Sequence, residues 1–400
     1  MPTTGADLKV EETKHQNGEG GVLRVLHLHS GNMCGGVETL LVTLARLRQL
    51  CPSMEPHFGL CYEGRLSREL QSAGVPVYFF GQVRISRPWT GWRARRHLRM
   101  LLECEHFDAA VCHMPWPLVI FGSTLRRAGP PVVFWAHGPH DGRNRLERMA
   151  QRHTPDVTVA NSSFVAHSAA SLFPGVPTRV LYIPVVLGNG SKSAEWRGTV
   201  RRELGVDEQT VVIIQVSRAE AWKGHLLHIR ALAELKHLKG WTCWMAGGPQ
   251  NSNEARYFHQ VQQMAADLGI ADRVRFLGQR SDVAQLLAGA DIFCQPNEGP
   301  EPFGIVFVEA LWAGRPVVTT AMGGALELVD DSCGLRVEPG SPAKLAAALE
   351  QLIVSSALRS RLGAAGPARA KCLCDPASQI PALQELLRST VLAMVGGLRG

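Results

Sequence analysis

Residues 296–320 read PNEGPEPFGIVFVEALWAGRPVVTT, and the rest of the chain is interpreted around them. A loop rich in proline and glycine comes first, and Pro302 suits the first turn of a helix, where its missing N–H is no loss. Small and apolar residues continue the helix to Gly314, and Arg315-Pro316 ends it. The β-branched residues 317–320 suit a buried parallel strand. The stretch therefore predicts one loop, helix and strand of a doubly wound α/β fold.

Two glutamates, Glu301 and Glu309, flank the start of this predicted helix. The backbone N–H groups of Phe303, Gly304 and Ile305 would have no helical partner, and with the helix dipole they predict a site for a phosphate or another anion. Eight residues at helical rise span roughly 12 Å, so the two carboxylates could hold hydroxyls on either side of a diphosphate. A buried helix with one capping and one solvated glutamate explains the same spacing.

Length and composition bound the remaining possibilities. A chain of 400 residues is too long for one ordinary core and indicates two or three domains. It is 45% hydrophobic and 19% charged, which is typical of a soluble globular protein, and no stretch of eighteen apolar residues predicts a membrane span. Ten scattered cysteines without a CxxC pair argue against a metal site and indicate a reducing cytoplasm. The polar residues 1–20 predict a disordered tail rather than a secretory signal.

The N-terminal part alternates apolar strands with helical patterns. Residues 22–28 predict a first strand, and Gly35-Gly36 then precedes a helix with apolar residues at helical spacing. The glycines do not match GxGxxG, so a dehydrogenase-type dinucleotide site is unsupported, whereas close approach to a phosphate or sugar stays open beside a simple tight turn. Further strands are expected at residues 58–62, 75–80, 109–113, 132–136, 157–160 and 180–183. The alternation predicts a mostly parallel sheet that helices cover on both faces.

His137 follows the strand expected at residues 132–136. Ligands of open α/β sheets bind outside the carboxyl ends of the strands, so His137 is the best site candidate in this part of the chain. A structural histidine at the strand end is the alternative.

A second alternating series follows residues 184–197, which are rich in glycine, asparagine and serine and predict a linker. The strand expected at residues 210–216 leads into a turn that Arg218 and Lys223 flank, where a phosphate would meet a helix start. Two solvated surface charges are the alternative. Strands are also expected at residues 242–246, 274–277, 292–294 and 317–319.

The net charge of +7 is concentrated between Arg84 and Arg99. This segment reads RISRPWTGWRARRHLR, with Trp89 and Trp92 among its arginines. Arginines with interleaved tryptophans suit a lipid headgroup surface or an anionic acceptor, and a solvated helix face is the alternative.

With these motifs in order, the chain resembles the GT-B glycosyltransferases of the large retaining family 4, from roughly residue 22 to the end. EPFGIVFVEALWAGRPVV is similar to the E-x7-E signature of that family. Three further motifs support the resemblance: Ser217-Arg218 with Lys223-Gly224, Gly323-Gly324 to Glu327, and Gly35-Gly36-Val37-Glu38. The resemblance implies an α/β GT-B fold, in which two Rossmann-like domains face each other across a cleft.

The resemblance also implies domain limits. They are a tail (1–20), an acceptor domain (21–187), a nucleotide-sugar donor domain (188–375) and a C-terminal helix (376–400) that packs back on the acceptor domain.

Roles for single residues follow from the resemblance. Arg218 and Lys223 would neutralise the diphosphate of a nucleotide sugar and stabilise the leaving nucleoside diphosphate, together with the backbone N–H groups of Phe303 and Gly304. Glu309 would hold the ribose hydroxyls.

The remaining roles concern the sugar. Glu301 would contact the donor sugar, and His137 would lie beside it from the other domain. Gly35 and Gly36 would leave room for it.

The implied function is retaining, metal-independent glycosyl transfer to a saccharide or lipid-linked acceptor in polysaccharide, lipopolysaccharide or glycolipid biosynthesis. No cofactor is expected beyond the nucleotide-sugar substrate. The location would be the cytoplasm, with peripheral contact to an anionic membrane through Arg84 to Arg99 and no nucleic-acid partner. A nucleotide-sugar epimerase of the same fold and a non-catalytic binding protein are the alternatives. The donor base (UDP, GDP or ADP), the sugar and the acceptor stay open.

Overall fold

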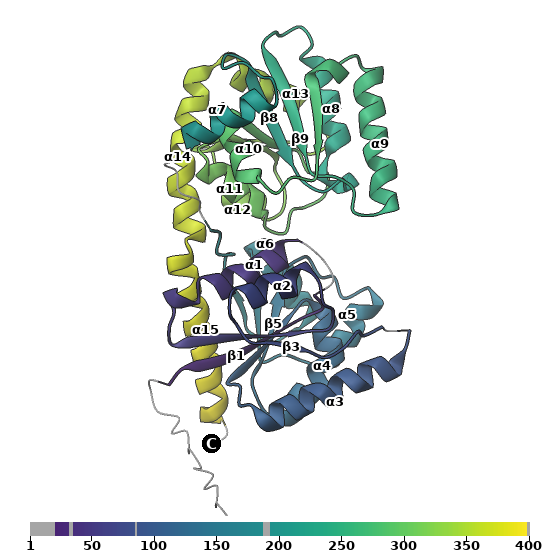
Figure 1. Cartoon of the computed structure of the whole chain (residues 1–400), viewed down its shortest axis with the longest axis vertical. Helices are drawn as coiled ribbons and strands as arrows, with labels where there is room; N and C mark the ends of the chain where they lie inside the picture. Colours follow the sequence, from purple (N-terminus) through teal and green to yellow (C-terminus); the bar gives the residue numbers. More distant parts are fainter. Residues whose placement is uncertain (1–20, 32–34, 85, 187–192, 398–400) are drawn as a thin grey trace, which may run out of the picture.

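The chain forms two α/β halves that lie one above the other (Figure 1). The computed structural model describes residues 21–31, 35–84, 86–186 and 193–397. The tail predicted at residues 1–20 lies outside the described residues. We call the part around the first sheet the first half and the part around the second sheet the second half.

The sheet of the first half is parallel throughout, with strand order β3-β2-β1-β4-β5-β6-β7 among the described residues. Its strands are β1 (Leu23–His29), β2 (Met54–Leu60), β3 (Val77–Phe79), β4 (Ala109–His113), β5 (Val132–Ala136), β6 (Val157–Ala160) and β7 (Thr178–Val180). The helices that accompany it are α1 (Gly36–Arg46), α2 (Arg65–Ser72), α3 (Pro88–Cys104), α4 (Pro115–Ala128), α5 (Arg145–Ala150) and α6 (Ser163–Leu172).

The second sheet is also parallel, with order β10-β9-β8-β11-β12-β13 in the described part of the chain. Its strands are β8 (Val211–Val216), β9 (Trp241–Ala246), β10 (Val274–Gly278), β11 (Ile292–Gln295), β12 (Val317–Thr320) and β13 (Gly334–Val337). The helices are α7 (Ser193–Glu203), α8 (His225–Glu234), α9 (Ser252–Asp267), α10 (Val283–Gly289), α11 (Ile305–Trp312), α12 (Ala325–Leu328), α13 (Pro342–Val354) and α14 (Ser356–Cys374).

The inner strands are buried along their whole length because helices cover both sheet faces. Every residue of β4, β5, β9 and β12 is buried. A strand buried on both faces requires a continuous apolar run rather than an alternating one. The two parallel sheets confirm the α/β fold class that the alternation of strands and helices predicts.

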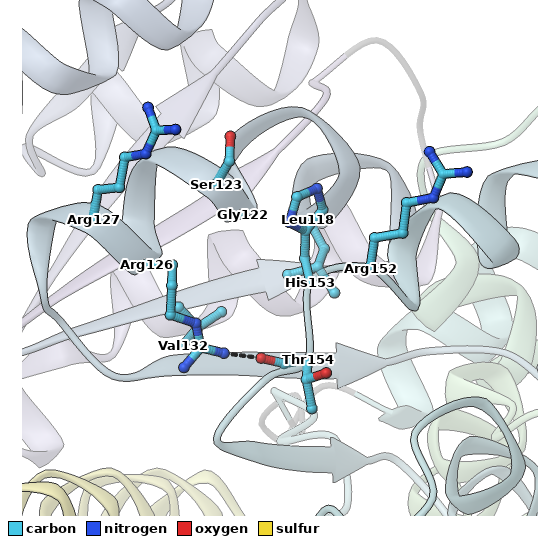
Figure 2. A pocket seen from close by; sticks show the side chains of 9 residues that line it. All are labelled: Leu118, Gly122, Ser123, Arg126, Arg127, Val132, Arg152, His153 and Thr154. Carbon is cyan, nitrogen blue, oxygen red and sulfur yellow. Dashed lines mark hydrogen bonds between the residues drawn. The ribbon is translucent and has the colours of Figure 1, made fainter.

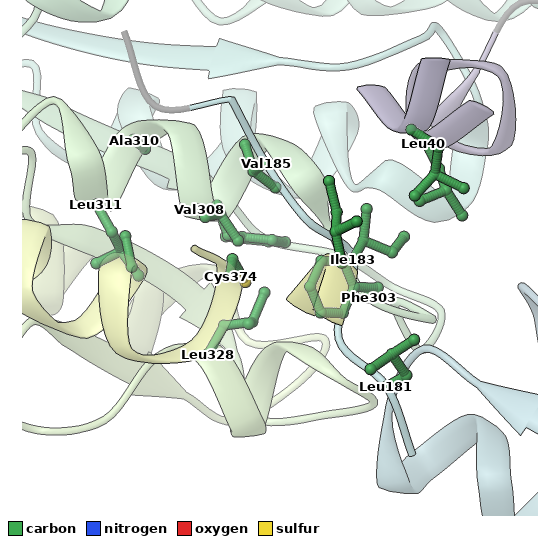
Figure 3. Packing of buried hydrophobic residues seen from close by; sticks show 14 of the residues in the cluster. Leu40, Leu181, Ile183, Val185, Phe303, Val308, Ala310, Leu311, Leu328 and Cys374 are labelled. Carbon is green, nitrogen blue, oxygen red and sulfur yellow. The ribbon is translucent and has the colours of Figure 1, made fainter. Parts of the chain in front are cut away.

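One hydrophobic cluster joins the two halves (Figure 3). Leu40 of α1 and Ile183 and Val185 of the connecting segment belong to the same cluster as Phe303 and Val308 of the second half, and all five are buried. Apolar surface excluded from water stabilises the contact by roughly 25 cal/mol per Å². The halves are therefore held together by an apolar core in addition to polar contacts.

A long C-terminal arm runs along one side of both halves (Figure 1). It consists of α14 and α15 (Pro376–Gly397), and Val185 N–H donates to the Cys374 carbonyl where the two helices meet. Within α15, Gln384 Nε2 donates to Ser53 Oγ at 2.6 Å, and Arg388 Nη2 donates to the Gly21 carbonyl at 2.8 Å. The last helix thus contacts the first half.

Within the described residues, no helix is long and apolar enough to cross a bilayer.

Several predicted element limits are wrong, and the strand expected at residues 58–62 is β2, which begins four residues earlier at Met54. The helix that follows the quoted loop begins at Ile305, with Gly304 as N-cap at φ 95°, so Pro302 lies in the loop rather than in the first helical turn. Residues 193–197, predicted as linker, form the start of α7. The helix propensity of SAEWR favours a helix more strongly than the neighbouring serine and glycine residues disfavour it. The predicted strand at residues 180–183 is displaced to β7, which within the described residues pairs with β6 alone.

The edge strand β13 was not predicted from the sequence. It has only four residues, begins with Gly334 and carries the partly exposed Arg336, so it lacks the apolar run that marks the other strands.

Gly224 allows two loops of the second half to pack closely, because it has no side chain. Its φ is 72°, and a Cβ there would lie 1.7 Å from the Pro296 carbonyl oxygen. Gly205 has a φ of 55° with no atom within 4 Å of a Cβ, so it is a matched control for the backbone conformation alone. We expect Gly205→Ala to cost about 1–2 kcal/mol of unfolding free energy. Gly224→Ala should cost about 1–3 kcal/mol more, as measured by urea denaturation. Equal losses of unfolding free energy in the two variants would show that the close contact with Pro296 does not contribute to stability.

Candidate active site

Loops that follow β8, β11 and β12 meet at one edge of the second sheet. Parallel strands bring their carboxyl ends to the same edge, so residues far apart in the sequence become neighbours. The backbone of Glu301 pairs with that of Gly323, and Gly324 N–H donates to the Glu301 carbonyl at 2.7 Å. Glu298 N–H donates to the Trp222 carbonyl at 2.8 Å. The three loops therefore form one connected unit.

Lys223 and Glu301 form an ion pair in this unit. Lys223 Nζ lies 2.7 Å from Glu301 Oε2, and the two side chains are only 14% and 8% exposed. The same oxygen accepts from Asn297 Nδ2 at 3.0 Å and from Gln295 Nε2 at 3.2 Å. A buried charge needs such compensation, because leaving water costs several kcal/mol per ion. All three bonds go to Oε2, so the pair uses one of the two carboxylate oxygens of Glu301.

The position of Lys223 is set by its neighbours. Nζ lies 3.8 Å from the centre of the Trp222 ring, a distance at which the π face attracts a cation. The Lys223 carbonyl accepts from Gln215 Nε2 at 2.9 Å, and His228 Nδ1 lies 2.9 Å from Gln215 Oε1. Because an ammonium group has three donors, Lys223 can bind Glu301 and also reach an anion.

Arg218 lies in the same loop but has different partners. Its guanidinium pairs with Glu254 of α9 and lies 3.4 Å from Glu220. Glu254 is held in turn by Asn251 and by the Gln250 N–H. The structure therefore brings Lys223 and Glu301 together as a pair and assigns Arg218 to a neighbouring pair.

The start of α11 faces the glycine turn of the first half. Gly304 adopts φ 95°, where a Cβ would lie 2.2 Å from the Phe307 ring, so only glycine fits. Phe303, just before it, is buried beside Tyr182. A Cβ on Gly36 would lie 3.4 Å from Ile305 Cδ1. The predicted Gly35-Gly36 turn and the predicted anion site at α11 are thus neighbours.

Glu309 is one of the residues that line a cavity between the halves. The cavity has a volume of about 240 Å³ and is bordered by Thr39 and Thr43 of α1, by Val185 and by Glu309. Burial raises the pKa of the Glu309 carboxyl to about 7. The two glutamates of the quoted stretch therefore differ, since Glu301 is compensated by a lysine and Glu309 carries a desolvation cost that a hydroxyl ligand would relieve.

His137 belongs to a row of three buried histidines. His27 Nδ1 lies 3.0 Å from His113 Nε2, and His113 Nδ1 lies 2.9 Å from His137 Nε2. Burial lowers the pKa of His27 and His137 to about 3 and that of His113 well below its usual value. All three rings are neutral, and each link needs one donor and one acceptor, so the three tautomers are coupled.

The residue after His113 carries backbone strain. Met114 has φ 73°, the one non-glycine residue with positive φ in the described part of the chain. Such conformations cost about 1–3 kcal/mol and cluster at functional sites.

Several residues at this site were not among the predicted site residues. Asn161 Nδ2 donates to the His137 carbonyl at 3.3 Å, and Ser162 Oγ donates to the Pro302 carbonyl at 2.6 Å. Both residues directly follow β6. The rule that ligands bind outside the carboxyl ends of the strands, which selected His137 after β5, would therefore also have selected them. Asn297 follows β11 in the same way. Tyr182 carried no sequence signal of this kind.

Glu327 links the two halves. Its carboxylate accepts from the N–H groups of Ser163 and Phe164 at 2.9 and 3.1 Å, at the start of α6, and from Tyr182 Oη at 3.0 Å. A carboxylate is stabilised at a helix N-terminus by the unpaired N–H groups and the helix dipole. Burial and the Glu327 charge raise the pKa of Tyr182 to about 12, so the tyrosine stays protonated and donates. Glu327 is therefore a polar latch between the halves.

Two family descriptions match the chain. Residues 34–186 match Glycosyltransferase Family 4, and residues 197–369 match Glycosyl transferases group 1. Together they span the loops of both halves described above.

Relatives support the same family. A D-inositol 3-phosphate glycosyltransferase of Actinosynnema mirum is 32% identical over 67% of this chain and 69% of its own. The lipopolysaccharide core biosynthesis glycosyltransferase LpsE of Rhizobium meliloti is 27% identical over 71% of this chain and 84% of its own. The matches cover 65% and 69% of the length of two inositol phosphate glycosyltransferases and 37% to 62% of the length of others.

Among solved structures, Anabaena Alr3699/HepE in complex with UDP and glucose is similar, with a TM-score of 0.79 and 25% identity. The likeness covers 92% of this chain and 100% of that one. It confirms the predicted GT-B fold.

The latch yields a prediction about the contact between the halves. Glu327→Ala removes three hydrogen bonds to a carboxylate, and we expect a loss of about 1–3 kcal/mol of unfolding free energy. The radius of gyration in small-angle X-ray scattering should increase as the halves separate. Asp331→Ala, which removes an exposed carboxylate paired with Arg336, is the control and should change neither quantity. Wild-type values of both the unfolding free energy and the radius of gyration in Glu327→Ala would refute the latch.

Proposed function

The chain belongs to the group 1 glycosyltransferases of family 4, and on this premise we propose that it moves a sugar from a nucleotide-diphosphate sugar to a saccharide or lipid-linked acceptor. The observation that carries the proposal is the Lys223–Glu301 pair beside the glycine-led start of α11, which faces Gly36. A positive side chain and unpaired N–H groups at one place suit a diphosphate.

In this proposal the second half holds the donor. Lys223 and the N–H groups of Phe303, Gly304 and Ile305 contact the diphosphate and stabilise the negative charge that develops on the leaving nucleoside diphosphate. Arg218 lies in the same loop beside Glu254 and Glu220, and in this proposal its guanidinium donates to the diphosphate when the donor binds.

Glu309 accepts hydroxyls of the ribose in the cavity between the halves. Oε1 of Glu301, which the ion pair does not use, accepts a hydroxyl of the donor sugar.

The first half meets the sugar. Gly35 and Gly36 leave room beside Ile305, and His137 lies at the end of the histidine row. His137 Nδ1 has no partner among the described residues, so a sugar hydroxyl, which can donate or accept, would satisfy this buried nitrogen in either tautomer. His27 and His113 hold the ring in place for this contact.

Family membership supports a proposal for the chemistry. We propose that the anomeric configuration is retained and that no metal is required, because Lys223, Arg218 and the helix start supply the positive charge. Alr3699/HepE, which was solved with UDP and glucose, makes a UDP-sugar the first donor to test. A phosphorylated polyol and a lipopolysaccharide core sugar are the acceptor classes that the named relatives suggest.

Donor binding gives the first test. Lys223→Met combined with Glu301→Gln removes both members of the pair, so no unpaired charge stays buried. We expect its Kd for a UDP-sugar, measured by calorimetry, to rise by on the order of 10- to 100-fold. This change corresponds to the free energy that a hydrogen bond to a charged group contributes. Wild-type affinity in the variant would contradict the proposal.

The same titration at several pH values tests Glu309. Its pKa of about 7 places ionisation between pH 6 and 8, and the ionised carboxylate accepts hydroxyls better. Wild-type affinity should therefore rise with pH through this range, whereas Glu309→Gln should bind more weakly and without this dependence.

We further propose that α3 contacts an anionic membrane surface. Its exposed residues form a helical stripe of two tryptophans and several arginines: Trp89, Trp92, Arg93, Arg96 and Arg99. The tryptophans are 60% and 63% exposed. Exposed aromatic rings beside cations are typical of a helix that lies in a headgroup layer.

Vesicle sedimentation tests this surface. Arg93→Gln with Arg96→Gln should lower partitioning onto phosphatidylglycerol vesicles by about 2 kcal/mol, since each basic residue contributes about 1 kcal/mol. Val354→Ala with Leu392→Ala removes exposed apolar residues elsewhere and should have no effect. If the wild-type chain does not sediment with anionic vesicles, the membrane proposal is wrong.

A further inference from the structure

A second basic pocket lies in the first half, away from the candidate active site (Figure 2). It has a volume of about 500 Å³ and lies between the end of α4, the segment after α5 and the start of β5. Its lining residues are Leu118, Gly122, Ser123, Arg126, Arg127, Val132, Arg152, His153 and Thr154. The volume is in the range of small-molecule sites.

The pocket carries more positive than negative charge. Three arginines and one histidine line it, and no carboxylate is among its described lining residues. Arg126 pairs with Asp156 at 3.2 Å and donates to the Thr154 carbonyl. Within the described part of the chain, Arg127 and Arg152 have no carboxylate partner, and Figure 2 shows both side chains extending away from the ribbon on either side of His153. Two guanidinium groups are therefore available to an anion.

His153 lies among the arginines of this pocket. Its ring is half-buried and packs on Gly122, where a Cβ would lie 2.8 Å from it, so glycine is needed at that position. Burial lowers the pKa of His153, and the charges of Arg95, Arg126 and Arg152 lower it further. Cations thus surround the imidazole from α3, from α4 and from its own segment. A bound anion would offset their charge and raise the pKa of His153.

The position of the pocket separates it from the donor loops. Val132 is the first residue of β5, whereas His137 directly follows its last residue. The pocket and His137 therefore lie at opposite ends of this strand. Five residues of strand span roughly 17 Å. An anion in this pocket would not touch the reacting groups.

We propose that this pocket binds the phosphate monoester of a second ligand. Guanidinium groups match phosphate oxygens in bidentate geometry, and the hydroxyls of Ser123 and Thr154 add short donors. Leu118 and Val132 provide an apolar wall for the part of the ligand that carries the phosphate.

Two sources of such a phosphate are chemically equivalent, a water-soluble phosphate ester and a lipid headgroup. The pocket adjoins α3, since Arg95 Nε donates to the Ile120 carbonyl of α4 at 2.7 Å. A headgroup could therefore reach the pocket from a membrane on which α3 lies, and the experiment has to separate the two sources.

Titration of the full chain with glycerol 3-phosphate, followed through the ring signal of labelled His153, tests the site. The signal should shift saturably and the His153 pKa should rise. Arg127→Gln with Arg152→Gln should weaken binding by on the order of tenfold or more. The exposed pair Arg230→Gln and Arg361→Gln carries the same change of charge in the second half and should bind as the wild type does. Lys223→Met with Glu301→Gln should also bind normally, which separates this site from the donor site.

Vesicles separate the two sources. Preference for phosphatidic acid over phosphatidylglycerol vesicles, lost in Arg127→Gln with Arg152→Gln, assigns a lipid headgroup. Saturable binding of glycerol 3-phosphate without that preference assigns a soluble ester. If His153 does not respond to either probe, or if the double variant binds as tightly as the wild type, the proposed site is wrong.

Discussion

The buried ion pair between Lys223 and Glu301 is the interaction on which the rest of the second half depends. It joins the loop after β8 to the loop after β11 at 2.7 Å, and Asn297 and Gln295 complete the bonds of the same carboxylate oxygen. Two charges in a poorly hydrated place are stable only while they compensate each other. The pair therefore fixes the position of a cation that has donors left for a ligand.

Glycine backbones make the approach to this pair possible. Gly224 lets the Lys223 loop touch Pro296, and Gly304 turns the chain into α11 where a side chain would collide with Phe307. On the opposite side, Gly36 brings the first half to Ile305. Glu327 at the start of α6 and the shared apolar cluster around Ile183 then hold the halves in this arrangement. Donor loops, glycine turn and histidine row thus form one site because both halves are held in contact.

Much of this fold could be predicted from the sequence, because buried parallel strands need continuous apolar runs. The strands β4, β5 and β6 begin and end where the apolar runs predict. Predictions failed where local preference conflicts with tertiary context. Pro302 was placed in a helix because of its fixed φ, yet the helix begins at Ile305, with Gly304 as its N-cap. The edge strand β13 is too short and too polar to be recognised.

The site was only partly predictable for a similar reason. Glu301, Glu309, Lys223 and the glycines carry a motif or a spacing, and the structure shows that Lys223 and Glu301 are paired. Contacts between the halves leave no such trace. The bonds of Glu327 to Ser163 and Phe164 join positions more than 160 residues apart, and nothing in either stretch alone indicates the other. The histidine row likewise arises from three strands that become neighbours only in the folded sheet.

A crystal structure of the chain with a UDP-sugar would test the central claim most directly. The account predicts that the diphosphate lies within hydrogen-bonding distance of Lys223 Nζ and of the N–H groups at the start of α11. It also predicts that Glu309 contacts the ribose. A diphosphate bound elsewhere, with the Lys223–Glu301 pair out of its reach, would contradict the account.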